Sequence, residues 1–381
     1  MLVQPPLPPE YTDRTDGELR RRIGAAREKL GRRLVILGHH YQQDDVIAFA
    51  DFTGDSLKLS QRAAEQTQAE YIVFCGVHFM AESADILTGD GQQVILPDLT
   101  AGCSMADTAH IDEVEAIWPV VEKCSAVPIT PITYVNSSAA VKVFVGRHDG
   151  ACCTSSNAKL VLEWALHGAA ADARGGRADG HKVLFLPDQH LGRNTAYALG
   201  WPLDTMVVYD PQQPYGGIGA ERLRAARFIL WKGHCSVHQL FTPAQCDAIR
   251  ALPDPYRIIV HPECTWEVCQ KADYVGSTEY IIQTVRDAPP GTYWAVGTEL
   301  HLVNRLASTL KDRHVRSLAG MQCLCSTMYR IDLPHLCWVL ENLVAGNVVN
   351  RIQVDEETKH WSHIALDRML ALRPTQPVSA K

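Results

Sequence analysis

The sequence predicts an α/β protein made of three related units with parallel sheets. Short apolar runs end in polar turns, an amphipathic helical stretch follows each run, and this pattern recurs in three successive parts of the chain. At 381 residues the chain is also too long for one ordinary core.

Six apolar runs are the expected strands. They are the runs in RLVILGHHYQ, EYIVFCGVHF, VPITPITYVNSS, HKVLFLPDQHLG, YRIIVHPECTW and TYWAVGTELH. Polar residues follow each run directly, which places them at the carboxyl edge of the predicted sheets. Ligands bind at that edge in open α/β sheets, so the functional residues are expected there.

Each unit is expected to repeat a strand turn followed by a hydroxyl-rich turn that opens a helix. The pairs are GHHY with TGDSLKLS, YVNSS with CCTSSNAKL, and HPECTW with VGSTEYIIQ. A chance echo in a chain rich in βα elements is the alternative, and the repeat alone leaves it open.

Composition excludes several classes of protein. The net charge of −7 gives no basic surface for nucleic acid, and 46% apolar residues is ordinary for a globular chain. The N-terminus has no secretory signal pattern, and no apolar run approaches the roughly 20 residues of a membrane span. A cytoplasmic protein with no membrane contact is therefore expected. Residues 168–180 are interpreted as a surface insertion.

Twelve cysteines in a cytoplasmic chain predict buried fillers, catalytic thiols or metal ligands rather than disulfides. No CxxC motif is present, so any metal must be held by distant cysteines. Three lie in polar turns: Cys103, Cys235 and Cys325. Spacing alone does not select them, since a buried inert thiol is the default for each.

Two further groups carry candidate chemistry. Ser56, Ser155, Ser277 and Thr278 stand where helices begin, where a hydroxyl either caps the helix or binds a carboxylate or phosphate with the helix N–H groups. Six residues with acid–base or hydrogen-bonding groups follow strands: His39, Tyr41, Tyr134, Asn136, His261 and Glu263. His, Tyr and Glu in such turns are typical of proton transfer, although each alone could be a structural hydrogen bond.

From about Leu34 to Val349, the motifs together resemble the quinolinate synthase family. The resemblance rests on GHHYQQDDV, ADFTGDSL, FCGVHFMAE, LPDLTAGCSMAD, YVNSSAAVK, CTSSNA, FLPDQHLGRNTA, WKGHCSVHQLF, HPECTWEV, ADYVGSTEYI, VGTELHLVNRL and CSTMYRIDLPHL. It implies three similar three-layer α/β units around a pseudo-threefold axis, with the active site at the centre. The expected units are 19–105 completed by 326–372, then 106–236 and 237–325, with a flexible lead-in at 1–18 and a flexible tail at 373–381.

The resemblance also implies a [4Fe–4S] cluster held by Cys103, Cys235 and Cys325, one from each unit. Three ligands leave one iron free for Lewis-acid chemistry. The implied reaction condenses iminoaspartate with dihydroxyacetone phosphate to give quinolinate, phosphate and water in NAD biosynthesis. Transient contact with the enzyme that makes iminoaspartate is a further expectation.

The family pattern assigns a role to each candidate residue. Substrate carboxylates or phosphate would be held by His39, Ser56, Ser155, Ser277 and Thr278, and the pocket lined by Tyr41, Tyr134 and Asn136. Glu263 would be the general acid–base, with His261 beside it, and Tyr41 and Tyr134 would complete the catalytic residues.

This sequence departs from the family pattern at two places. The second histidine of the His39-His40 pair replaces a frequent asparagine and leaves the role of His40 open. Only Cys323-x-Cys325 stands where some members have CxxCxxC, so a redox switch is not supported and Cys323 is the alternative third ligand.

Three other functions remain open from the sequence. They are another [4Fe–4S] hydro-lyase, a metal-free α/β transferase with buried cysteines, and a non-catalytic iron–sulfur sensor or scaffold. Iron content and a substrate assay separate them.

Overall fold

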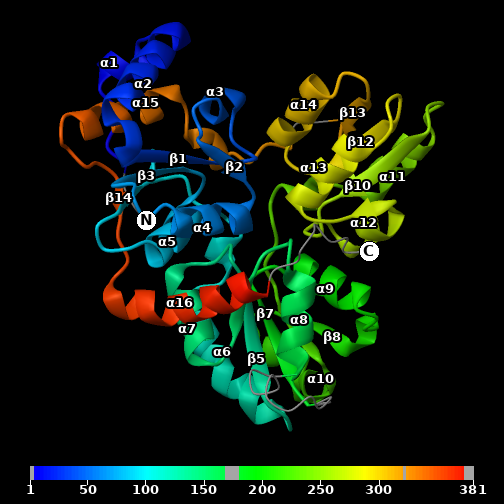
Figure 1. The fold of residues 1–381 in the computed structure, drawn as a ribbon. Helices are drawn as coiled ribbons and strands as arrows, with labels where there is room; N and C mark the ends of the chain where they lie inside the picture. Colours follow the sequence, from blue (N-terminus) through cyan, green and yellow to red (C-terminus); the bar gives the residue numbers. More distant parts are fainter. Residues whose placement is uncertain (1–3, 168–179, 321–322, 373–381) are drawn as a thin grey trace. The chain divides into compact units, whose positions relative to one another are not determined.

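The α/β prediction is confirmed by the computed structural model, which describes residues 4–167, 180–320 and 323–372 (Figure 1). These described residues form three sheets, and every strand pair in them is parallel except β14 with β4. The expected tail at 373–381 and all but Gly180 of the expected insertion lie outside the described residues. By internal contacts the chain forms two units, residues 1–103 with 324–355, and residues 104–323 with 356–381.

The first unit holds one five-stranded sheet in the order β14-β4-β3-β1-β2. Its strands are β1 (Leu34–His39), β2 (Phe52–Gly54), β3 (Tyr71–Cys75), β4 (Gln93–Ile95) and β14 (Arg351–Ile352). Its helices are α1 (Pro9–Thr12), α2 (Asp16–Leu30), α3 (Asp44–Ile47), α4 (Ser56–Glu65), α5 (His78–Leu87) and α15 (Leu333–Val344). Because α2 and α15 lie on one side of the sheet and α4 and α5 on the other, β1 is buried along its whole length (Figure 1).

The N-terminal stretch differs from the expected flexible lead-in. From Gln4 onward it contacts the first unit: the Gln4 side-chain oxygen accepts hydrogen bonds from Leu99 N at 3.1 Å and Asn350 Nδ2 at 2.7 Å. Tyr11 is 6% exposed and donates to Glu341 Oε2 at 3.0 Å. Burial of the apolar ring of Tyr11 makes this packing favourable. The proline run before it did not predict this contact.

The second unit holds two sheets, ordered β6-β5-β7-β9-β8 and β11-β10-β12-β13. The strands of the first are β5 (Ile129–Tyr134), β6 (Ala151–Cys153), β7 (Lys182–Leu186), β8 (Met206–Tyr209) and β9 (Phe228–Trp231). Those of the second are β10 (Tyr256–Val260), β11 (Tyr274–Val275), β12 (Tyr293–Gly297) and β13 (His314–Ser317). All six predicted strands are therefore present, as β1, β3, β5, β7, β10 and β12.

Helices of the second unit connect these strands. They are α6 (Ile111–Cys124), α7 (Ala139–Arg147), α8 (Ala158–His167), α9 (Gln189–Ala198), α10 (Ala220–Ala225), α11 (Pro243–Arg250), α12 (Trp266–Lys271), α13 (Thr278–Asp287), α14 (Leu300–Thr309) and α16 (Glu356–Ala371). Within the described residues, no helix combines the length and the apolar character that a membrane crossing needs.

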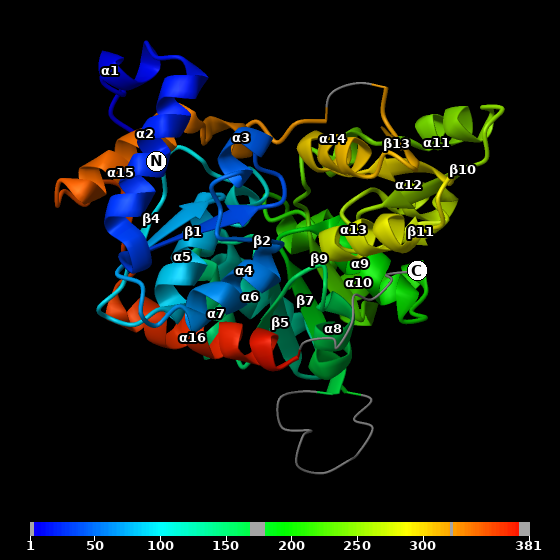
Figure 2. The same ribbon diagram turned by 45° about the horizontal axis from the view of Figure 1, so that its top comes forward.

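The C-terminal segment divides between the two units, whereas residues 326–372 were expected to complete the first unit as one piece. Residues 324–355, with α15 and β14, pack with the first sheet, but α16 runs beside α7 (Figures 1 and 2). The approach of α16 is close, since a Cβ at Gly146 would lie 2.0 Å from the carbonyl oxygen of Trp361. The Ser362 hydroxyl also donates to Ala139 O at 3.2 Å.

The three sheets share one strand order. Corresponding neighbours are β2-β1-β3-β4, β6-β5-β7-β9 and β11-β10-β12-β13. In each sheet the first strand lies between the second and the third, and a later strand, β4, β9 or β13, pairs on the far side of the third. The repeat seen in the turns is thus a repeat of topology. The boundaries of the three predicted units at 19–105, 106–236 and 237–325 and the pseudo-threefold axis remain predictions.

Candidate active site and cysteine loops

The predicted residues of the first unit gather at the carboxyl ends of β1 and β2. His39 is paired with Gly54, and His40 N donates to Gly54 O at 3.1 Å. The Nδ1 atom of His39 accepts a hydrogen bond from Tyr41 N at 3.1 Å, and the Tyr41 ring packs on His39 edge-on with centroids 4.8 Å apart. These contacts fix the His39 ring and leave the strand-end turn next to the start of α4.

At the start of α4 the helix cap is made by Asp55 rather than Ser56. The Asp55 carboxylate accepts from Lys58 N at 2.9 Å. Ser56 is the first helical residue, so its hydroxyl stands beside the open N–H groups of the first turn. At α13 the cap is Ser277, whose hydroxyl accepts from Tyr280 N at 3.3 Å, with Thr278 in the position equivalent to Ser56.

The second sheet brings Tyr134 and Ser155 together at its carboxyl edge. Tyr134 is paired with Cys153, and Val135 N donates to Cys153 O at 2.8 Å, so the turn after β5 adjoins the turn before α8. Asn136 lies in the first of these turns, and its buried side-chain oxygen has no hydrogen-bond partner among the described residues. A buried acceptor of this kind is costly unless a ligand or water satisfies it.

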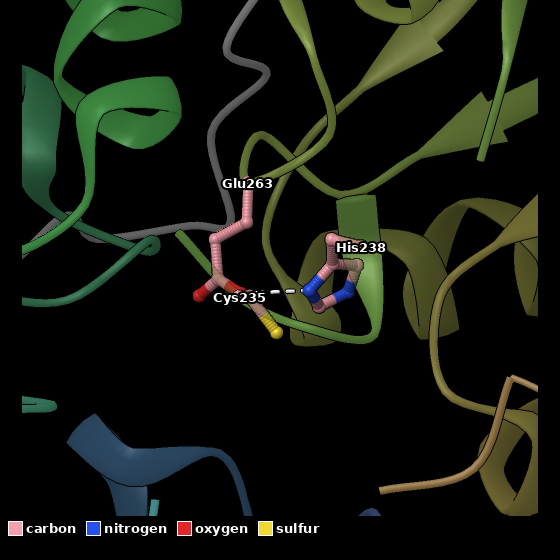
Figure 3. A group of neighbouring side chains, drawn as sticks. All are labelled: Cys235, His238 and Glu263. Carbon is pink, nitrogen blue, oxygen red and sulfur yellow. Dashed lines mark hydrogen bonds and ion pairs between the residues drawn. The ribbon is translucent and has the colours of Figure 1, made fainter. Parts of the chain in front are cut away.

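In the third sheet the HPEC turn follows β10, and Glu263 is its buried acid, 3% exposed. The Nδ1–H of His238 donates to Glu263 Oε2 at 2.7 Å, because an ionised carboxylate can only accept (Figure 3). On the other side of the ring, His238 Nε2 lies 3.1 Å from the Thr298 hydroxyl. Tyr134 gives Glu263 a further side-chain hydrogen bond. Strands β5, β9, β10 and β12 thus all contribute to one centre.

His261 stands beside Glu263 as expected, but its direct partner is different. Glu263 N donates to His261 Nδ1 at 3.4 Å, so Nε2 carries the proton and donates to Ser155 Oγ at 3.1 Å. His261 Nδ1 is 3.9 Å from Glu263 Oε1, and its ring stacks on His238 at 4.5 Å. Burial lowers the pKa of His261 to about 3, so the ring is neutral near pH 7.

The Glu263 carboxylate is held ionised. Burial alone raises its pKa, but the neighbouring imidazoles of His261 and His238, with hydrogen bonds from His238 and Tyr134, outweigh burial and set the pKa below its usual range. Asp188 behaves in the opposite way: burial and then the negative charge of Glu263 raise its pKa well above the usual value. Glu263 is therefore ionised and able to accept a proton.

Asn194 of α9 supports the HPEC turn from below. Its Nδ2 group donates to the carbonyl oxygens of Pro262 and Cys264, both at 2.8 Å, one on each side of Glu263. Neither Asn194 nor His238 nor Thr298 was predicted from the sequence. Their signals in the sequence were the second histidine of GHCSVH for His238, the asparagine of GRNTA for Asn194 and the hydroxyl directly after the VG of VGTEL for Thr298.

The three predicted cysteine ligands differ in exposure from all other cysteines. Cys103, Cys235 and Cys325 are half-buried, while the remaining nine thiols are buried. Burial raises the pKa of Cys75, Cys152 and Cys337 to about 12, so these are inert fillers. Cys323, the alternative ligand, is also buried, and burial raises its pKa.

The same three cysteines occupy equivalent loops. Each follows the strand that pairs on the far side of the third strand of its sheet, β4, β9 or β13. Each is followed by serine and then by one turn of 3₁₀ helix, at Ala106–Thr108, His238–Leu240 or Met328–Arg330. The Cys235 loop is placed by a close approach: a Cβ at Gly233 would lie 2.2 Å from Pro187 O. The Cys-Ser pair that recurs in the loop after this strand was a signal in the sequence that the spacing of the cysteines did not supply.

Fold and site define an α/β enzyme with a buried carboxylate–histidine centre at the carboxyl edge of its sheets. A family model described as "Quinolinate synthetase A protein" matches residues 21–371. Relatives named "Quinolinate synthase" include those of Acidobacterium capsulatum (57% identical, 95% of each chain covered), Nocardioides sp. (56%, 96% of this chain and 91% of the relative) and Geobacillus kaustophilus (55%, 96% of each). The chain belongs to the quinolinate synthetase A family.

Proposed function

We propose that this enzyme is a quinolinate synthase that condenses iminoaspartate with dihydroxyacetone phosphate, releasing phosphate and water, in NAD biosynthesis in the cytoplasm. The name carried by its relatives points to this reaction. The structural observation that supports this reaction most is that three cysteines on equivalent loops are half-buried, whereas the nine other thiols are buried.

A [4Fe–4S] cluster held by Cys103, Cys235 and Cys325 fits these residues. A cluster needs thiolates that it can reach, and the other nine thiols are buried. The residues next to two of the ligands also meet, since Ser104 Oγ is 3.4 Å from Ser236 Oγ. When bound, a cluster with three cysteine ligands supplies one open iron as a Lewis acid.

Glu263 is the proposed general acid–base. Its carboxylate takes up a proton from substrate carbon or nitrogen and returns it to a leaving hydroxyl, and the His238 Nδ1–H keeps the acceptor oxygen in place. The Tyr134 hydroxyl, hydrogen-bonded to Glu263, is the second proton-transfer group. His261 stays neutral and presents its Nε2–H through Ser155 as a donor.

Anionic groups of the substrates are assigned to the helix starts. Ser56 at α4 and Thr278 at α13 stand in equivalent first-turn positions, where free N–H groups and the helix dipole favour carboxylate or phosphate. The unpartnered oxygen of Asn136 is the matching acceptor for a substrate N–H or hydroxyl. His39 and Tyr41 complete the set from the end of β1, and Tyr41 is proposed to act in proton transfer.

The test is an anaerobic iron and sulfide count combined with detection of quinolinate. We expect a brown protein with about four irons per chain that makes quinolinate from both substrates. Cys103→Ser, Cys235→Ser and Cys325→Ser should each abolish cluster assembly, while Cys152→Ser, Cys246→Ser and Cys337→Ser should not. Full cluster content in any of the first three variants would show that the ligand assignment is wrong. Delivery of iminoaspartate by transient contact with the enzyme that makes it belongs to the same proposal.

A further inference from the structure

Cys235, His238 and Glu263 converge on one point (Figure 3). Among the residues that the structure describes, they form the one group of three Cys, His or acidic side chains whose ligand atoms all lie within 4.8 Å of one another. All three belong to the unit of residues 104–323 and 356–381. The group is thus complete in one unit, whereas the cysteine triad draws Cys103 and Cys325 from the other.

We propose that in chains without the iron–sulfur cluster these three residues bind Zn²⁺, through Cys235 Sγ, His238 Nδ1 and a Glu263 carboxylate oxygen, with water as the fourth ligand. Thiolate, imidazole and carboxylate are the ligands that zinc prefers, and three protein ligands with an open fourth position are a common zinc arrangement. On binding, the Cys235 thiol gives its proton to solvent and the His238 proton moves from Nδ1 to Nε2.

The distances require only a small adjustment. His238 Nδ1 and Glu263 Oε2 are 2.7 Å apart in the hydrogen bond. Tetrahedral zinc with bonds of about 2.0–2.3 Å separates its ligand atoms by roughly 3.3–3.6 Å. Moving the pair apart by less than about 1 Å therefore makes room for the ion, and Cys235 Sγ lies within 4.8 Å of both atoms.

The spacing and the charges also suit zinc. Cys235 and His238 lie three residues apart, with His238 at the start of a 3₁₀ turn, which brings the sulfur and Nδ1 to the same side. One thiolate and one carboxylate neutralise the two charges of the ion, so no net charge is buried with it. His238 and Glu263 are buried, while half-buried Cys235 leaves a way in.

The surrounding contacts already orient the ligands. The Thr298 hydroxyl lies 3.1 Å from His238 Nε2, so it can accept a hydrogen bond from the relocated N–H and keep Nδ1 facing Glu263. Tyr134 holds Glu263 by a hydrogen bond. Outer contacts of this kind fix the tautomer of a metal-binding histidine and strengthen the site.

Zinc in this site competes with the enzyme's own cofactor. It withholds Cys235 and Glu263 together, so a zinc-loaded chain neither assembles the cluster nor has a free general base; this consequence rests on the proposed function. The binding itself does not, because it needs only the three side chains.

The test uses Co²⁺ as a coloured substitute for zinc, added to the full-length protein after iron and sulfide have been removed anaerobically. We expect one equivalent to bind with a thiolate-to-cobalt charge-transfer band and intense tetrahedral visible bands, both removed by adding Zn²⁺. Cys235→Ser and His238→Gln should lose the charge-transfer band or weaken binding at least about 10-fold, and Thr298→Val, which keeps all three ligands, should weaken it about 10-fold.

Cys103→Ser and Cys325→Ser are the matched controls. We expect them to bind Co²⁺ as the unaltered chain does although they hold no iron–sulfur cluster, and circular dichroism checks that every variant is folded. A charge-transfer band that persists in folded Cys235→Ser, or that disappears in Cys103→Ser, overturns the zinc proposal. An iron and sulfide count of the unaltered protein tests the cluster separately, so failure of one proposal is distinguishable from failure of the other.

Discussion

At the scale of single residues, the acid–base centre depends on which protons are held in place. Glu263 is ionised because its hydrogen bonds and neighbouring imidazoles outweigh the cost of burial, and His261 is neutral because burial is not outweighed. These two buried groups lie two residues apart in the chain and have opposite proposed roles, Glu263 as proton acceptor and His261 as donor. Sequence reasoning found both residues, but the pairing of Glu263 with His238 came only from the structure.

Replacing Glu263 by glutamine should lower kcat by about 100-fold or more, since the amide keeps the shape but cannot accept a proton. The cluster should be retained, because Glu263 is not one of its proposed ligands. Initial rates of quinolinate formation, measured with an iron count, check this. Glu267→Gln, an exposed acid four residues on, is the control. A kcat for Glu263→Gln within about three-fold of the unaltered enzyme would contradict the role.

The buried histidine at position 190 should make stability depend on pH. Burial, helped by Arg193 and His234, lowers the pKa of His190 to about 4. The unfolded chain binds this proton below about pH 6.5 and the folded chain does not, so its share of stability is full above pH 6.5 and is lost as the pH falls toward 4.

Between pH 7 and 5 the unaltered protein should therefore lose about 1–2 kcal/mol more of its free energy of unfolding than His190→Gln, which cannot titrate. Urea titrations at both pH values measure the difference. His360→Gln, at an exposed site, should follow the unaltered protein. Equal losses in all three proteins would mean that His190 does not stay neutral in the folded chain.

At the scale of elements, strand ends and helix starts position the chemistry. The carboxyl ends of β5, β9, β10 and β12 each deliver one side chain to the centre around Glu263, and α9 supports the HPEC turn from beneath. The turn sequences predicted where these strands end and where the following helices begin. They did not predict Asn194, because its partners are backbone carbonyls 68 and 70 residues away.

Asn194→Asp should destabilise the fold by about 3 kcal/mol, because a carboxylate would face two carbonyl oxygens in place of two N–H donors. Asn304→Asp, at an exposed position of α14, is the control and should change stability by less than about 0.5 kcal/mol. Urea unfolding of both variants measures the effect. A loss below about 1 kcal/mol for Asn194→Asp would show that the two hydrogen bonds do not hold the turn.

At the scale of the whole molecule, the chain builds three sheets of one strand order and ties its C-terminal helix to the second. The contact of α16 with α7 leaves no space at Gly146, where a Cβ would lie 2.0 Å from Trp361 O. Gly24 in α2 is the matched case, because no heavy atom lies within 4 Å of its Cβ position.

Gly146→Ala should therefore lower the free energy of unfolding by about 3 kcal/mol through the forced displacement of α16. Gly24→Ala should leave it unchanged or raise it by up to about 1 kcal/mol, since alanine is the better helix former. Thermal and urea unfolding report both values. Equal stability of the two variants would show that α16 yields without cost.

The sequence by itself determined the α/β class, the six principal strands and the turns that carry the proposed acid–base residues, because apolar period and turn chemistry are local properties. It also contained the Cys-Ser pair of all three cysteine loops. The family resemblance selected these cysteines, and the sheet topology then explained why their loops are equivalent. Tertiary structure alone decided which thiols are exposed, that the N-terminal stretch packs on the first unit, and that α16 belongs with α7. It alone paired His238 with Glu263 and Thr298, since such contacts depend on which strand ends meet, and that is set by packing between segments far apart in the chain.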